Sequence, residues 1–203
     1  MAEKTRVYME TGSKKTFASA ADWPGWSRGG KDEASALQAL ASYGPRYAKV
    51  AKLAGIDFPQ DATESFNVIE RQNGSASTDF GVPGMPAKNE GKPLTASESE
   101  RLSSLVDAGW KYLDQVKARA PQSLRKGPRG GGRDRDKMYD HVLESEVGYA
   151  KMIGVSIKKP DRDALREAFR NPNRDSRWPV AYAMRRIAWH ALDHAWEMED
   201  LIP

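Results

Sequence analysis

The sequence contains no cysteine, which excludes disulfide bonds, thiolate metal ligands and a cysteine nucleophile. A metal site in this protein must therefore use nitrogen and oxygen ligands, and any thiol chemistry must use a thiol supplied by a second molecule. Long apolar runs are also missing, since no stretch approaches the ~18 residues of a membrane-spanning helix. Residues 1–15 lack the apolar segment of a secretory signal, so we expect a cytoplasmic protein.

Excess charge is absent outside one segment. The chain has a formal net charge of +4, and residues 125–137 alone carry six Lys or Arg and two Asp. The remainder is balanced, which argues against a nucleic-acid-binding protein. The basic segment is rich in glycine and leads into an expected helix, an arrangement that suits an anionic ligand such as the carboxylates of a small thiol. Its candidate binding residues are Arg129, Arg133 and Arg135. The alternative is a solvated loop with nonspecific affinity for polyanions.

Histidine is rare, with three copies in the chain. His190 and His194 lie four positions apart in a segment of helical periodicity that starts after Pro179. At 100° per residue both fall within the stripe that must face a core, with Cβ atoms ~6 Å apart. Two imidazoles at this spacing can chelate one metal ion.

The third histidine, His141, lies on an expected helix over residues 133–154, on the same face as Tyr149. Antiparallel packing of this helix against the last one would bring all three histidines to a similar level. Three buried, unpaired imidazoles would be costly, whereas a shared cation satisfies them together. We therefore predict a divalent metal site formed by His141, His190 and His194. The alternative is that each histidine is a satisfied core residue or faces solvent.

Two charged residues share the histidine stripe and are candidates for a catalytic role. Arg186 could hold a substrate carboxylate, and Glu197 could accept a hydrogen bond from a ligating histidine or act as a base. The alternative is that they pair with each other or with another helix. Trp189 and Trp196 lie off this stripe, so we expect them to pack against the N-terminal part of the chain or against a second subunit in a homodimer.

Residues 1–72 predict a small α/β module. Alternating apolar residues indicate three strands, at residues 6–11, 16–21 and 64–72. Residues 22–33 are rich in turn formers and are expected to hold no regular structure. A helix is expected from Asp32, and Gly44-Pro45 is expected to bend or interrupt it.

The second half of the chain predicts a helical bundle. Residues 73–94 have the glycine, proline and serine content of a surface linker. Phe80, Val82 and Met85 could attach this linker to the protein surface. Thr95 and Glu98 then form a capping box at the start of the first of four amphipathic helices. Four such helices within residues 95–203 indicate a four-helix bundle. The expected fold class is α+β, with the small α/β module followed by this bundle.

The histidine segments resemble a known family. "DKMYDHVLESEVGYAKMIG" followed by "RRIAWHALDHAWEMEDLI" is similar to the DinB-like superfamily of four-helix bundles, over roughly residues 95–203. The resemblance implies that His141 is the single ligand and that His190 and His194 are the paired ligands of a zinc or nickel ion. Some relatives are S-transferases that use bacillithiol or mycothiol, and one branch isomerises maleylpyruvate. The resemblance therefore implies a metal-dependent transferase or hydrolase that acts on a small molecule with a low-molecular-weight thiol.

The N-terminal segment "TFASAADWPGWSRGGKDEASALQAL" resembles the HicB-like antitoxin fold, in which a strand, a D-x-P-G turn and a helix follow in order. Because a helical bundle replaces the usual DNA-binding tail, the resemblance implies a docking, dimerising or lid role. Two functions therefore remain open: a metal-dependent enzyme, and a non-catalytic interaction protein whose HicB-like module docks a partner.

Overall fold

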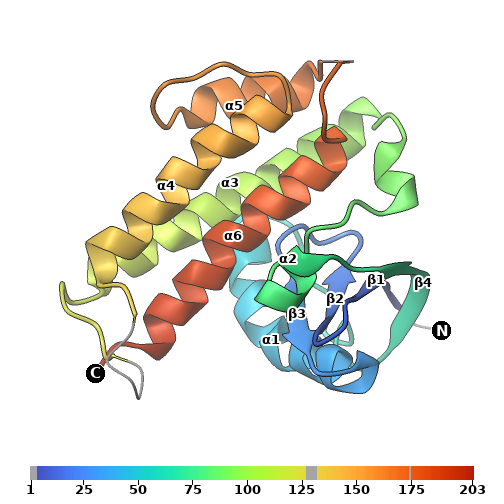
Figure 1. The fold of residues 1–203 in the computed structure, drawn as a ribbon, viewed down its shortest axis with the longest axis horizontal. Coiled ribbons are helices and arrows are strands. Elements are labelled where there is room, and N and C mark those ends of the chain that lie inside the picture. The colour runs from blue at the N-terminus through green and yellow to red at the C-terminus, as the bar shows by residue number, and fades with distance from the viewer. Residues whose placement is uncertain (1–3, 127–131, 174) are drawn as a thin grey trace.

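The computed structural model describes residues 4–126, 132–173 and 175–203. The fold is mixed α+β, with a sheet near the N-terminus and helices toward the C-terminus (Figure 1). The strands are β1 (Thr5–Thr11), β2 (Thr16–Ala20), β3 (Ser27–Gly30) and β4 (Phe66–Asn73). The helices are α1 (Glu33–Leu53), α2 (Ala76–Phe80), the short 3-10 helix η1 (Lys88–Gly91), α3 (Ala96–Arg119), α4 (Arg135–Met152), α5 (Arg162–Arg170) and α6 (Val180–Asp200).

The sheet has the strand order β3-β2-β1-β4. β1 and β2 form the predicted antiparallel hairpin, and β4 pairs in parallel with β1 because α1 supplies the crossover that a parallel connection needs. The predicted third strand is confirmed as β4. β3 contradicts the expectation of irregular structure, since Ser27–Gly30 pairs with β2 although two of its four residues are glycine. Pairing with a buried neighbour thus overrides a poor strand propensity.

The ends of the long helices follow their capping residues. Asp32 caps α1 by accepting a hydrogen bond from the backbone N of Ser35 at 2.8 Å, and Thr95 with Glu98 forms the predicted capping box of α3. α1 continues through Pro45, so of the two expected effects of Gly44-Pro45, a bend or an interruption, the interruption does not occur. Proline removes one backbone hydrogen bond, and the buried side chains on both sides of it hold the helix against the rest of the protein.

The central strands are covered on both faces. α1 packs against β2 and β3 on one face. On the other face, Phe17 meets the ring of Trp189 edge-on with centroids 6.3 Å apart, and the Tyr8 hydroxyl donates to Asn89 Oδ1 at 2.6 Å. Residues of the N-terminal sheet and of the C-terminal helices therefore belong to one buried apolar cluster.

The segment at 73–94 is held to β1 by a buried carboxylate. Glu10 accepts hydrogen bonds from the Thr78 hydroxyl and from the backbone N of Gly84 and Met85, the last two at 3.0 Å. Of the three apolar residues that could attach this segment, Phe80 is 86% exposed, whereas Val82 and Met85 are partly buried. The attachment is polar because backbone N–H groups that approach a covered sheet need an acceptor, and Glu10 supplies it.

The predicted tryptophan packing against the N-terminal module is confirmed. Besides Trp189, Trp196 meets the ring of Tyr43 with centroids 5.1 Å apart. Gly25, in the turn after β2, has a φ of 92°, and a Cβ there would lie 2.7 Å from Leu192 Cδ1. The turn therefore lies against α6 and requires glycine. Across the described ranges, we find no helix with the length and apolar character needed to cross a membrane.

Candidate metal centre

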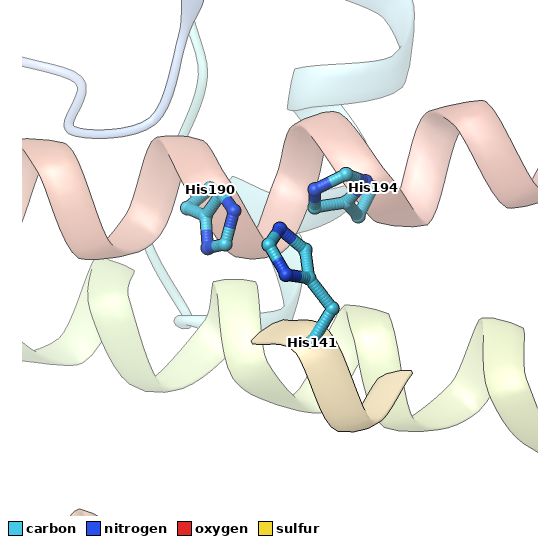
Figure 2. A group of neighbouring side chains, drawn as sticks. All are labelled: His141, His190 and His194. Atoms are coloured by element: carbon cyan, nitrogen blue, oxygen red, sulfur yellow. The ribbon is translucent and has the colours of Figure 1, made fainter. Parts of the chain in front are cut away.

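The three histidines converge where α4 and α6 lie side by side. The two helices run antiparallel, as predicted, and bring His141 opposite His190 and His194 (Figure 1). Figure 2 shows His141 rising from α4 toward the two histidines of α6. One ring nitrogen from each side chain can be chosen such that all three lie within 4.8 Å of one another. The predicted convergence of these side chains is therefore confirmed.

Two of the imidazoles lie in surroundings that favour the neutral form. His190 is 7% exposed, and burial lowers its pKa to about 2, with further contributions from His194 and Arg186. Burial, followed by the charge of Arg133, also lowers the pKa of His141. Neutral imidazoles keep the lone pair that a metal ligand must donate. The Nδ1 atom of His190 is buried and has no hydrogen-bond partner among the described residues.

The third imidazole is oriented by a carboxylate. His194 Nδ1 lies 2.8 Å from Glu197 Oε2, one helical turn further along α6. With Nδ1–H donating to this oxygen, Nε2 carries the lone pair, which is the common arrangement for histidines that bind metal. The hydrogen bond from His194 lowers the pKa of Glu197. Of the two sequence-based alternatives for Glu197, the structure has the contact with histidine and not a pair with Arg186.

Arg186 lies one turn before His190 on α6 and is 8% exposed. Its guanidinium carbon lies 4.5 Å from the ring centroid of Trp189 and 5.3 Å from that of Tyr149. Its Nη1 is buried and without a hydrogen-bond partner in the described part of the chain. The Tyr149 ring in turn packs against the ring of His190, with centroids 5.7 Å apart. Sequence periodicity placed Tyr149 on this face, but its position between Arg186 and His190 is a tertiary feature.

The basic loop contributes one exposed guanidinium to this neighbourhood. Arg133 is exposed, and its charge reaches His141 and His190 strongly enough to lower their pKa values. Arg135 donates to Asp136 Oδ1 at 2.9 Å and to the carbonyl of Ala120 at 3.0 Å, so its donors are occupied within the protein. Arg129, the third predicted anion-binding residue, lies outside the described residues.

Comparison of the chain with protein-family models, with curated proteins and with solved structures finds no match. The chemistry of the centre therefore follows from its own residues. Three imidazole nitrogens are a ligand set that suits zinc, nickel, copper and iron, and they leave further coordination positions open. A buried Nδ1 without a partner among the described residues and a carboxylate-oriented His194 fit such an ion.

Proposed function

We propose that this chain is a DinB-like divalent-metal-binding protein and a metal-dependent enzyme. In the proposal, His141, His190 and His194 hold one zinc or nickel ion, and the activity is a thiol-dependent transfer or a hydrolysis of a small molecule. The observation that carries it is the convergence of three ring nitrogens within 4.8 Å, one histidine having a buried Nδ1 without a partner among the described residues. An isolated cluster of this kind would leave buried polar atoms unsatisfied, and a cation removes that cost.

The geometry supports coordination after small side-chain rotations. Zinc–nitrogen bonds are about 2.0–2.1 Å long, so tetrahedral ligand nitrogens lie roughly 3.3 Å apart. The nitrogens of His141, His190 and His194 lie within 4.8 Å, and rotation about their side-chain bonds can close the difference. Glu197 limits the rotation of His194 by accepting its Nδ1–H.

The open coordination position supports catalysis more than a purely structural role. A bound divalent ion would lower the pKa of a thiol or a water toward neutrality and so supply a nucleophile. Because the chain has no cysteine, the thiol would be a separate small molecule. The residues of the chain would then bind and orient: His194 is held by Glu197, and Tyr149 shields His190 from water.

The N-terminal module is proposed to be HicB-like and to act as a cover for the helices. From Thr16 to Leu53 a strand, a turn and a helix follow in the order of that resemblance, with the short strand β3 between the turn and the helix. The alternative is a non-catalytic interaction protein that docks a partner through this module. β1 and β2 are covered on both faces by the chain itself, which favours a role within the molecule over an open docking sheet.

Metal analysis of protein purified without a histidine tag tests the proposal. We expect about one divalent ion per chain, and its loss in each of the variants His141→Ala, His190→Ala and His194→Ala with helical content retained. Glu144→Ala is the matched control, because Glu144 is an exposed carboxylate on the same helix as His141. If all three histidine variants keep the metal content of the parent protein, the site assignment is wrong. Binding of a small thiol to the metal-loaded protein would separate the enzyme from the interaction protein.

A further inference from the structure

Arg186 is a buried cation with no counter-ion in the described part of the chain. Among those residues, its guanidinium takes part in no hydrogen bond or ion pair, and the residue is 8% exposed. Burying an unpaired charge is unfavourable, so most buried arginines are paired with carboxylates. Its neighbour Arg185 follows that rule, since it donates to both oxygens of Glu90 at 2.6 and 2.9 Å. The molecule thus stabilises one of two consecutive buried arginines and leaves the other without an acceptor among the described residues.

The surroundings of Arg186 point to the histidine centre. His190 lies four positions further along α6, which is ~6 Å along the helix axis and the same helical face. The Tyr149 ring bridges the two, at 5.3 Å from the guanidinium carbon and 5.7 Å from the His190 ring. The rings of Tyr149 and Trp189 restrict the guanidinium and keep it in a surrounding of low polarity, where a hydrogen bond to an anion is strong.

The described acids on the same stripe are already engaged elsewhere. Glu197 is bonded to His194, and Asp193 forms an ion pair with Arg28 at 2.7 Å. Arg133, an exposed residue of the basic loop, is a cation and supplies no acceptor. The indole Nε1 of Trp189 is a second buried donor without a partner in the described residues. Donors without acceptors therefore gather beside the candidate metal ligands.

We propose that Arg186 binds a carboxylate of the substrate or cosubstrate, so that the small molecule handled at the histidine centre is a carboxylic acid. The inference rests on the proposed function and specifies its substrate class. A guanidinium forms two parallel hydrogen bonds with a carboxylate, which gives both affinity and orientation. Held in this way, the molecule would have its metal-facing end about one helical turn from its acid group. Arg186 is thus a binding and positioning residue for the reaction.

Pairs of thiols that differ only in the acid group test this inference. The protein is loaded with cobalt(II), and thiolate binding is followed by the charge-transfer absorption of the metal. The first pair is 3-mercaptopropionate and 3-mercapto-1-propanol, and the second is 6-mercaptohexanoate and 6-mercapto-1-hexanol. The two chain lengths test two distances between the thiolate on the metal and the acid group at Arg186. We expect the acid of at least one pair to bind about tenfold or more tightly than its alcohol in the parent protein. 3-Mercapto-1-propanesulfonate tests whether the site recognises a planar carboxylate or any anion of the same charge.

Arg186→Gln is expected to remove the preference for the acid, and Arg186→Lys to keep part of it. Arg170→Gln, which removes an exposed arginine of α5, is the matched control and should retain the full preference. A parent protein without a preference for the acid would overturn the inference, as would an Arg186→Gln variant that keeps the preference. Equal binding of the sulfonate and the carboxylate would overturn the assignment of a carboxylic acid.

Metal content and succinate binding to the metal-free protein separate this inference from the proposed function. If the metal binds and the acid preference is independent of Arg186, the inference fails and the metal site stands. If no metal binds while succinate binds in an Arg186-dependent manner, the proposed function fails and the carboxylate site stands. Absence of both overturns both. If metal-free Arg186→Gln does not fold, Arg186→Lys takes its place. An Arg186→Lys variant that binds the acid as tightly as the parent protein, with the full preference over the alcohol, would contradict bidentate recognition.

Discussion

Arg185 and Arg186 are consecutive and both are buried, but Arg185 has hydrogen-bond acceptors around it that Arg186 lacks among the described residues. Arg185 donates to Glu90 and to the carbonyl of Met85 at 2.9 Å, and it joins α6 to the segment that covers the sheet. Arg186 lies against Tyr149 and Trp189 and has no acceptor among the described residues. One face of α6 is thus a polar interface in which the buried donors have acceptors. The other face carries buried donors that have no acceptor among the described residues.

The difference shows how a buried charge can be interpreted. A paired charge such as Arg185 belongs to the structure, because removing either partner leaves the other uncompensated. An unpaired charge such as Arg186 lowers stability, so its presence favours a role with a ligand. The same reasoning assigns a structural role to Glu10, which accepts three hydrogen bonds. It favours a role with a ligand for His190, whose Nδ1 has no partner in the described ranges.

The largest effect is expected at the satisfied interface. Glu90→Gln removes the carboxylate that pairs with the buried Arg185, and we expect a loss of about 3–5 kcal/mol in the free energy of unfolding. Urea denaturation of the full chain measures this. The control is Glu70→Gln, a partly exposed carboxylate that accepts a hydrogen bond from the backbone N of Lys88 at 3.1 Å. A loss for Glu90→Gln no larger than for the control would show that this ion pair does not hold the interface together.

A smaller effect is expected at Arg186. Arg186→Met in metal-free protein removes the cation–π contacts with Trp189 and Tyr149 and also removes the cost of burying an unpaired charge. Because these two changes oppose each other, we expect the free energy of unfolding to stay within about 1 kcal/mol of the parent value. The measurement is the same urea titration in the presence of a chelator. A loss as large as that of Glu90→Gln would mean that Arg186 is a structural residue, and the contrast with Arg185 would disappear.

The smallest effect is expected at Asp79, a partly exposed carboxylate in the segment at 73–94. The Ser13 hydroxyl, followed by the backbone N of Lys14, lowers the pKa of Asp79 to about 2 from an ordinary value of 3.8. Because the folded-state pKa is the lower one, this carboxylate stabilises the fold above about pH 4, and the contribution is lost as the pH falls toward 2. Asp79→Asn should therefore lower the melting temperature slightly at pH 6. The difference from the parent should shrink between pH 4 and pH 2, and a difference that stays constant would show that these hydrogen bonds do not lower the pKa of Asp79.

Local patterns in the sequence predicted most of the elements. Helical periodicity predicted α3 to α6 and a helix from Asp32, and the capping box of α3 was identified from Thr95 and Glu98 at the helix start. The spacing of His190 and His194, together with the inward face of His141, predicted that the three would meet. These features depend on neighbours in the chain, and such neighbours are visible in the sequence.

Contacts between distant parts of the chain could not be predicted in this way. β3 exists because it pairs with β2, and α1 continues through Pro45 with buried residues on both sides of the proline. The connecting segment is attached by Glu10 and not by Phe80. Periodicity could not assign these partners, since each requires knowing which surfaces face each other.

The amino-acid sequence alone specified the type and order of most elements, the absence of thiol ligands and the shared face of the histidines. Which buried charges have partners depends instead on tertiary packing. Arg185 finds Glu90 across 95 positions of the chain, whereas Arg186, the next residue, faces Tyr149 and the histidine centre. The physical reason is that a helix turns by about 100° at each residue, so two consecutive arginines point in different directions. What each of them meets there depends on how distant segments of the chain pack against the helix.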